Sequence, residues 1–275
     1  DSERVGVQVI DDDAGLRDAH DLYGRWARTQ TGQIVRSAPL FVRLCTAQDR
    51  VLMGWRGDDG ALEGYALAVY RTDLPRRERY LEVDELVWVT EAARRALYGW
   101  LSSLGDQWEQ LLLRALPSHR LGDWLREPRL PPGAAPLWGL WQPAATLLMG
   151  PMFRVVDMAG AWEHRRVADG PPLALAVEVA DAQIPENAGR WTIELDGGGA
   201  RARRAGEAHA AGDGPGVARR ATLRLDISTL SRIFIGSLAP SAGLATGLLE
   251  CDRPDLLPAL DAALALPEPW TFDRF

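Results

Sequence analysis

The stretch that decides the first half of the fold is RYLEVDELVWVTEAARR, residues 79–95. From Arg79 to Val89 polar and apolar residues alternate, which predicts a β-strand. Thr90 then offers a hydroxyl that can cap a helix from Glu91 to Leu104. Because the strand passes directly into a helix, this half of the chain is expected to be a sheet with helices packed on it.

Strands and helices also alternate on either side of this stretch. Ala14–Thr31 has apolar residues at the i, i+3, i+4 spacing of an amphipathic helix, which Gly32 ends. Pro128–Pro151 is rich in Pro and Gly and is predicted to be a linker. We therefore assign residues 1–150, linker included, to a domain with a mixed sheet and helices on both faces. Its other predicted elements are the strands Arg50–Arg56, Leu62–Arg71 and Glu109–Ala115, the turn Gly57–Gly60 and the short helix Leu121–Arg126.

The second half has a different order of predicted elements, because most of its strands come before its helices. This order predicts a second domain, residues 151–275, with helices packed on one face of a small sheet, so the whole chain is expected to be α+β. The predicted strands are Met152–Val156, Leu173–Ala180, Gly189–Leu195 and Ala221–Asp226, with a Gly- and Ala-rich loop at Gly206–Gly216. The predicted helices are Ala159–Arg165, Ile227–Gly236, Pro240–Leu248 and Pro254–Leu264.

Composition argues against several classes of function. The chain has 275 residues and a formal net charge of -7, and all 31 basic residues are arginine, so no basic stripe predicts a nucleic-acid partner. Its apolar runs fall short of the ~18 residues that a membrane-spanning helix requires. Cys45 and Cys251 stand apart from metal-ligand neighbours, so we expect buried free thiols in a reducing cytoplasm.

Searches for catalytic and cofactor motifs give no usable site. The sequence has no nucleophile-elbow serine, no histidine pair at metal-binding spacing and no P-loop, so no metal is expected. Arg203–Ala208 matches the [RQ]-x-x-G-x-[GA] loop that cradles a pyrophosphate. We reject this match because it lies in a glycine-rich hairpin rather than between a strand and a helix. Asp84 and Glu85 are adjacent in a strand, so they should point to opposite faces and not share acid–base chemistry.

The last residues, Pro267–Phe275 (PEPWTFDRF), form an aromatic and conformationally restricted tail. The two prolines favour an extended backbone, and Trp270, Phe272 and Phe275 carry apolar surfaces that are costly to expose. Chain ends usually fray, so a tail of this composition is expected to be tied down against the protein. Its residues could simply close a core, or they could place a terminal carboxylate inside the protein.

Several short segments share the order and spacing of one protein family. In the first half they are Leu22–Trp26, Gly64–Leu67 and Val83–Thr90, and in the second half Met152–Asp157, Asn187–Trp191 and Trp270–Phe275. With these segments the chain resembles the Eis (enhanced intracellular survival) family of aminoglycoside N-acetyltransferases. That family combines an N-terminal GNAT domain, a central degenerate GNAT domain and a C-terminal domain like sterol carrier protein 2. The resemblance implies that this chain holds the central and C-terminal domains and lacks the N-terminal one.

The resemblance also implies that the acetyl-CoA site lies outside this chain. In an active GNAT domain a glycine-rich phosphate loop follows the strand equivalent to Glu82–Val89, whereas this chain continues as Thr90–Arg95 without a glycine. Acetyl-CoA and the general acid would then belong to the N-terminal domain. The chain alone would bind no cofactor and be inactive. It opens on Asp1 rather than on methionine, which fits a truncated sequence.

A role for the tail follows from the same resemblance. In the family the C-terminal carboxylate is the general base for the acceptor amine, and in this chain that group is the α-carboxylate of Phe275. Trp270 and Asp157 would line the acceptor pocket, although Asp157 could instead cap the helix that begins at Ala159. The implied whole protein is a cytoplasmic homo-oligomer that moves acetyl from acetyl-CoA to a cationic amine such as an aminoglycoside.

Two other functions fit the same sequence. The second domain could be a non-enzymatic carrier that holds an apolar ligand between its sheet and the helices Ile227–Gly236 and Pro254–Leu264. Alternatively, both domains could serve mainly to assemble an oligomer. The residues that would line the carrier's cavity, and that form a plain core in the simpler interpretation, are Leu230, Ile233, Leu256 and Leu260.

Overall fold

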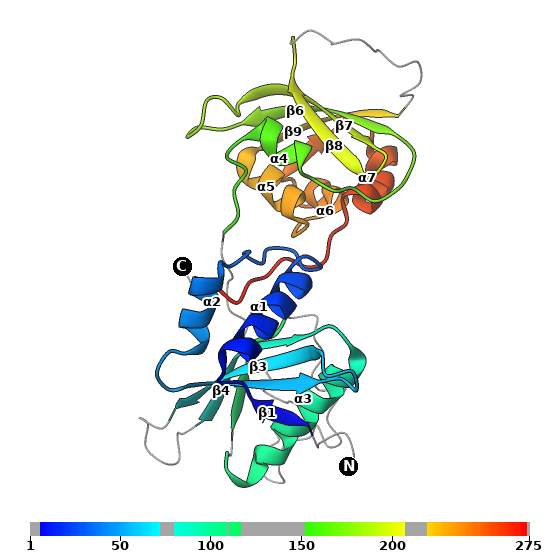
Figure 1. Cartoon of the computed structure of the whole chain (residues 1–275). Coiled ribbons are helices and arrows are strands. Elements are labelled where there is room, and N and C mark those ends of the chain that lie inside the picture. Colours follow the sequence, from blue (N-terminus) through cyan, green and yellow to red (C-terminus); the bar gives the residue numbers. More distant parts are fainter. Residues whose placement is uncertain (1–5, 72–79, 109, 117–151, 207–218, 274–275) are drawn as a thin grey trace, which may run out of the picture. The chain divides into compact units, whose positions relative to one another are not determined.

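A computed structural model describes residues 6–71, 80–108, 110–116, 152–206 and 219–273 (Figure 1). The chain divides into two units, the first made of Asp1–Pro151 together with Trp270–Phe275 and the second of Met152–Pro269. The division expected from the sequence assigned the whole tail to the second domain, whereas here its last residues group with the first unit. Within the described ranges no helix is long and apolar enough to cross a bilayer.

The first unit is built on a five-stranded sheet with the order β1-β2-β3-β4-β5. Neighbouring strands are antiparallel except for β4 and β5, which are parallel. The strands are β1 Val7–Val9, β2 Arg50–Arg56, β3 Leu62–Arg71, β4 Tyr80–Trp88 and β5 Leu111–Leu113. The helices are α1 Asp13–Ala27, α2 Ala38–Cys45 and α3 Glu91–Ser103, with a short 3-10 turn, Leu104–Asp106, after α3.

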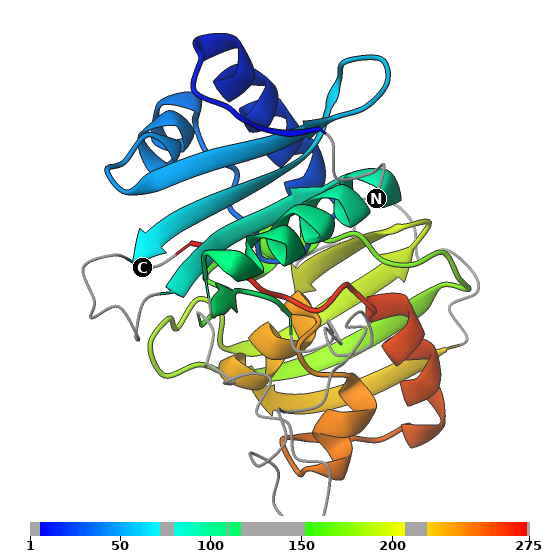
Figure 2. The same ribbon diagram turned by 90° about the horizontal axis from the view of Figure 1, so that it is seen from below.

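Helices cover both faces of this sheet, with α1 and α2 on one side and α3 on the other (Figure 2). The alternation along β3 explains the arrangement, because successive side chains point to opposite faces. Tyr65 and Leu67 are buried in a core with residues of α1 and α2. Ala66 and Ala68 are buried in a core with residues of α3. The mixed sheet with helices on both faces, which the sequence predicts, is therefore confirmed.

The strands β4 and β5 diverge at their carboxyl ends. They pair only from Leu81–Leu111 to Val83–Leu113, and β4 then continues to Trp88. The β3–β4 ladder shifts its register opposite Leu67 and Ala68, which leaves Asp84 as an extra residue in β4. Such a bulge bends its strand, in keeping with the divergence of β4 from β5.

The second unit is a five-stranded sheet, with the order β10-β9-β6-β7-β8, and helices that share one core with it. Only β6 and β9 pair in parallel. Alternate residues of β6 enter this core while those between them are more exposed, so the helices pack on one face, as predicted. The strands are β6 Leu173–Ala180, β7 Gly189–Asp196, β8 Gly199–Arg204, β9 Arg220–Asp226 and β10 Leu249–Cys251. The helices are α4 Met158–Glu163, α5 Ile227–Ile235, α6 Pro240–Ala245 and α7 Leu257–Leu264, preceded by a 3-10 turn at Pro254–Leu256.

The predicted strand Met152–Val156 is wrong, because no strand forms there. Side chains, rather than a neighbouring strand, satisfy its backbone. The amide of Val155 donates to Ser231 Oγ at 2.9 Å, and Asn187 Nδ2 donates to the carbonyls of Val155 and Val156 at 3.3 and 3.4 Å. The sequence predicts no bounds for α2 and none of the short strands β1, β8 and β10. The predicted helix Leu121–Arg126, the linker before Pro151 and residues 207–216 lie outside the described residues.

Candidate functional site

The tail Trp270–Asp273 lies along the segment that follows α1, within the first unit (Figure 1). The amide of Trp270 donates to the carbonyl of Thr31 at 3.0 Å. The side chain of Gln33 then pairs with the tail as a peptide group would. Its Nε2 donates to the carbonyl of Trp270 at 3.0 Å, and its Oε1 accepts from the amide of Phe272 at 3.5 Å. The expectation that the tail is tied down is therefore confirmed.

Aromatic contacts reinforce this backbone pairing. Phe272 stacks on Trp26 of α1 with ring centroids 5.3 Å apart, and it is only 5% exposed. Trp270 meets both rings edge-on, at 6.0 Å from Trp26 and 4.5 Å from Phe272. Each such pair contributes roughly 1 kcal/mol beyond the burial of its area.

A buried ion network fixes the end of the described tail. Arg36 Nη1 donates to Glu85 Oε1 of β4 at 2.6 Å, and Arg36 Nε donates to Asp273 Oδ1 at 3.1 Å. The guanidinium lies 4.5 Å from the ring centre of Tyr23 and is almost fully buried. Tyr65 donates its hydroxyl to the other oxygen of Glu85 at 2.8 Å. Burial raises the pKa of Glu85, while Arg36 and the Tyr65 hydroxyl oppose the rise by stabilising the carboxylate.

Arg114, just beyond β5, makes a second link between the tail and β4. Its guanidinium donates to the carbonyl of Phe272 at 3.4 Å and lies 3.3 Å from carboxylate oxygens of both Glu82 and Asp84. Asp84 also pairs with Arg50 at 3.1 Å. Asp84 and Glu85 thus join different ion networks, as their alternation in the strand predicts.

The sequence does not predict Gln33, Arg36 and Arg114 as tail-binding residues. One signal was available, because β4 carries Glu82, Asp84 and Glu85 in an otherwise apolar strand. All three carboxylates are buried, and buried charges require partners. The pattern could have predicted buried arginines around this strand, but not which ones.

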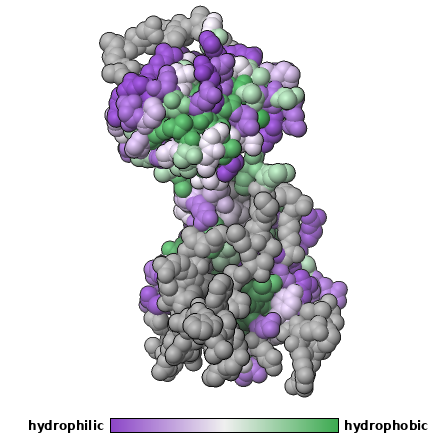
Figure 3. Space-filling view, turned by 180° about the vertical axis from the view of Figure 1, so that it is seen from behind, coloured by the Kyte–Doolittle hydropathy of each residue, from purple (hydrophilic) through white to green (hydrophobic). Residues whose placement is uncertain are grey.

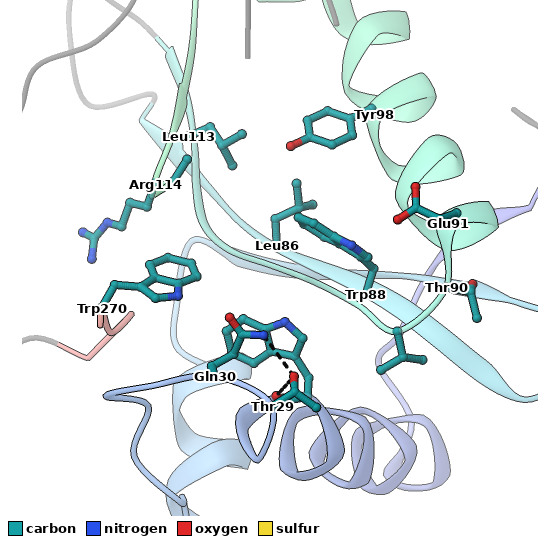
Figure 4. A pocket seen from close by; sticks show the side chains of 13 residues that line it. Thr29, Gln30, Leu86, Trp88, Thr90, Glu91, Tyr98, Leu113, Arg114 and Trp270 are labelled. Carbon is teal, nitrogen blue, oxygen red and sulfur yellow. Dashed lines mark hydrogen bonds between the residues drawn. The ribbon is translucent and has the colours of Figure 1, made fainter. Parts of the chain in front are cut away.

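A cavity of about 330 Å³ opens where β4 diverges from β5 (Figure 4). Side chains from α1 and the residues after it, from β4 and the turn after it, from α3 and from β5 and its end surround this space, and Trp270 of the tail completes it. All of them belong to the first unit. The lining residues are Trp26, Thr29, Gln30, Leu86, Trp88, Val89, Thr90, Glu91, Tyr98, Leu113, Arg114, Ala115 and Trp270.

The residues around this cleft do not fit the pyrophosphate of acetyl-CoA. A phosphate bound at the start of α3 would need free backbone amides and a positive field. Instead Thr90 Oγ1 accepts from the amide of Ala93 at 3.2 Å and donates to Glu63 at 2.6 Å. Glu91 adds a second carboxylate in the first turn of the helix. The helix start is therefore already capped by a side chain, with the carboxylates of Glu63 and Glu91 beside it.

The three site residues expected from the sequence have different outcomes. Trp270 is docked on the first unit, as described above. Asp157 belongs to the second unit, where its Oδ1 accepts from the amide of Gly160 at 3.1 Å and caps α4. Phe275 lies outside the described residues.

Metal and thiol chemistry receive little support. Among the described residues no group of His, Cys, Asp and Glu side chains could hold a metal ion. Cys45 and Cys251 are both free thiols, the first buried and the second half-buried. Burial raises the pKa of Cys45 to about 12, which leaves it a protonated and unreactive thiol at neutral pH.

Comparison with known protein families agrees with this architecture. Residues 32–155 match the model of an acetyltransferase (GNAT) domain, and residues 158–272 match that of a sterol carrier protein domain. The chain thus carries a GNAT-like domain followed by a sterol-carrier-like domain. A search of curated proteins gives no match.

Several solved structures have the same fold. One is a probable N-acyltransferase from Enterococcus faecalis V583. The match covers 98% of this chain and 62% of that protein's chain, with 19% sequence identity and a TM-score of 0.75. For a GCN5-related N-acetyltransferase from Anabaena variabilis, the match covers 99% of this chain and 63% of that protein's chain, with 18% sequence identity and a TM-score of 0.73. For an Eis protein from Mycobacterium abscessus, the match covers 99% of this chain and 63% of that protein's chain, with 22% sequence identity and a TM-score of 0.63. At these identities the likeness establishes the fold, and the chain spans about three fifths of the length of these proteins.

The role of Gln33 can be tested with the variant Gln33→Leu. It removes both hydrogen bonds from the tail while keeping the volume of the side chain. A neutral hydrogen bond contributes about 1 kcal/mol, so the loss of both should make the tail open roughly 30-fold more often. Amide hydrogen exchange of the peptide that contains Trp270–Asp273 measures this opening. Gln183→Leu, an exposed change in the second unit, is the matched control. Equal exchange in the two variants would contradict the role of Gln33.

Proposed function

We propose that this chain is part of an acetyltransferase that moves the acetyl group of acetyl-CoA to a primary amine of a cationic acceptor such as an aminoglycoside. The observation that carries the proposal is a tail held by Gln33, Arg36 and Arg114 on a GNAT-like unit. Proteins with the same fold include a probable N-acyltransferase and a GCN5-related N-acetyltransferase, which supports acyl transfer in general terms.

The proposed part for this chain is to supply a general base. Phe275 follows Asp273 by two residues, so a clamp on Asp273 limits the space that the α-carboxylate can explore. A general base must lie within hydrogen-bond reach of the proton that it removes, and a fraying terminus would not. As the amine attacks the thioester carbonyl, the carboxylate takes the amine proton, the carbon–sulfur bond breaks, and the general acid of the N-terminal domain protonates the thiolate of the leaving coenzyme A. A carboxylate and a net charge of -7 also favour a cationic acceptor.

Acetyl-CoA would bind to another part of the complete protein, namely an N-terminal GNAT domain. The capped and acidic start of α3 supports this division of roles, because it does not suit a pyrophosphate. Asp157 remains a proposed residue of the acceptor pocket, although its capping bond to Gly160 explains its position equally well. A cytoplasmic homo-oligomer completes the proposal. On the face seen in Figure 3, hydrophilic residues of the second unit surround an apolar area that could take part in such contacts.

The carrier alternative gains no comparable support. The apolar residues that would line a ligand cavity are all buried in one continuous core with the sheet. This arrangement favours the simpler interpretation, in which the second unit is a packed scaffold. The residues concerned are Leu230, Ile233, Leu256 and Leu260.

Deleting Phe275 tests the base directly in the complete protein. The deletion moves the terminal carboxylate back by one residue, and general-base catalysis contributes about 100-fold or more, so kcat should fall by about that factor while KM changes little. The substitution Phe275→Ala keeps a carboxylate at the same backbone position and should retain most of the activity. Acetyl transfer to an amine acceptor is the measurement. Unchanged turnover after the deletion would refute the base, and equal loss in both variants would assign the role to the side chain.

Thermal unfolding tests where the cofactor binds. A ligand at 100 times its Kd stabilises a protein by about 2.7 kcal/mol, which raises the Tm by several degrees. Acetyl-CoA should leave the Tm of this 275-residue chain unchanged and raise that of the complete protein. A saturable rise for this chain alone would overturn the assignment of the cofactor to another domain.

A further inference from the structure

We propose that the surface of the first unit that holds the tail is a peptide-recognition site, and that a second copy of this chain can fill it with its own tail. The site consists of Trp26, Thr31, Gln33, Arg36 and Arg114. Two copies would then be joined by swapped tails, whatever other contacts they make. This tail swapping does not depend on the proposed acetyl transfer.

The hydrogen bonds of this site select an extended peptide of any sequence. The amide of Trp270 donates to the carbonyl of Thr31. The side chain of Gln33 bonds the carbonyl of Trp270 and the amide of Phe272, and Arg114 donates to the carbonyl of Phe272. All these bonds use main-chain groups of the tail. They give affinity for an extended segment, while its side chains give the specificity.

Side chains of the tail supply the sequence preference. Phe272 stacks on Trp26 and is only 5% exposed, so this position favours an aromatic ring. The next residue, Asp273, meets the buried guanidinium of Arg36 at 3.1 Å, so a carboxylate follows the ring directly. Trp270 packs edge-on against both Trp26 and Phe272. The site therefore recognises two aromatic residues, one position apart, followed by an acid, and the tail of every copy supplies this combination.

The tail makes these contacts independently of its covalent connection to the site. Its partners Gln33, Arg36 and Arg114 lie 158 or more positions away along the chain. A second copy carries an identical tail, so that tail would make the same hydrogen bonds, ion pair and ring contacts. Swapping a terminal segment between identical copies thus preserves its contacts, which makes it a low-cost route to a dimer.

The connector before the tail is short and stiff. Leu266 is held on the second unit, because it packs so closely on Gly236 that a Cβ atom there would lie 2.9 Å from the Cβ of Leu266. Only Pro267–Pro269 separates Leu266 from the docked Trp270, and the two compact units divide at the end of this connector. Its two prolines restrict bending. A short hinge of this kind limits how a tail can fold back on its own chain, and so it favours swapping.

Tail swapping should depend on the concentration of the protein. A tail tethered by a few residues reaches its own site at an effective concentration of about 1 mM. Gln33→Leu should weaken the site of one copy about 30-fold. A second copy with an intact site, at about 0.3 mM, should then bind that tail about tenfold better than the tail's own site does.

A synthetic peptide tests the recognition. The probe has the sequence of residues 267–273 (PEPWTFD), with a fluorophore at its N-terminus and an amide at its C-terminus. It is titrated with the full chain carrying Phe272→Ala, whose own tail is weakened, and fluorescence anisotropy should show saturable binding. The same peptide with Phe272→Ala should bind at least about 100-fold more weakly, and adding Gln33→Leu to the chain should weaken binding of the intact peptide about 30-fold. Absence of saturable binding, or equal binding of the two peptides, would overturn the site.

Amide hydrogen exchange in a mixture of two variants tests the second copy as the partner. The chain with Gln33→Leu keeps the intact tail, and the chain with Phe272→Ala keeps the intact site. Mass spectrometry follows the two tails separately, because their peptides differ in mass. At about 0.3 mM the Phe272→Ala chain should slow amide exchange of the intact tail about tenfold, whereas a chain carrying both substitutions should leave it unchanged.

Unchanged amide exchange of the intact tail in this mixture would overturn tail swapping, even if the peptide binds. Equal slowing by the doubly substituted chain would show that the protection comes from outside the site, and it would refute the proposal as well. Amide exchange of β3, followed in every variant, confirms that the sheet of the first unit is intact. A lost effect can then be assigned to the tail or to its site.

Discussion

One buried guanidinium, that of Arg36, joins β4 of the first unit to the tail. It lies between Glu85 of β4 and Asp273 of the tail, and over the ring of Tyr23. Removing a charged group from water is costly, so a cation at this position is tolerated only while its carboxylate partners stay in place. The tail is consequently held by a buried ion pair as well as by apolar contacts. Its position is coupled to the strand that also determines where the sheet opens.

The divergence of β4 from β5 has two consequences at one place. The turn after β4 starts α3 with a capping threonine and nearby carboxylates, an arrangement that does not favour a bound phosphate. The gap between the strands remains, and the aromatic residues of the tail dock beside it and complete its wall. The GNAT-like unit thus carries a docking surface for the chain's own tail beside this turn. The docking of the tail on this surface connects the fold to the proposed function.

Much of the fold could be predicted from the sequence because strong local patterns specify it. The apolar segments Arg50–Arg56 and Leu62–Arg71, joined by a turn, and the segment Leu173–Ala180 form strands with the predicted bounds, and Thr90 caps α3 as expected. Short edge strands such as β1 and β10 carry too few residues to show a period. Met152–Val156 has a strand-like composition, but its partners are the side chains of Ser231 and Asn187, which no local pattern reveals.

Less of the candidate site than of the fold could be predicted from the sequence. The aromatic tail signals that it must dock somewhere, and it does. Its main polar partner, Gln33, lies 237 residues away from Trp270 in a segment without a regular pattern. The buried acids of β4 indicate that cations must surround this strand, but the choice of Arg36 and Arg114 depends on the three-dimensional course of the chain. Long-range contacts of this kind follow from packing and not from local propensity.

A double-mutant cycle between Arg36→Met and Asp273→Asn tests the central claim most directly. The cycle is best carried out in a Glu85→Gln background, so that loss of the guanidinium does not leave a buried carboxylate unpaired. The free energy of tail opening, measured by amide exchange of Trp270–Asp273, gives the coupling between the two residues. A coupling of about 1–2 kcal/mol is expected for a partly buried ion pair that holds the tail. Additive effects of the two substitutions would contradict the claim that Arg36 clamps the tail.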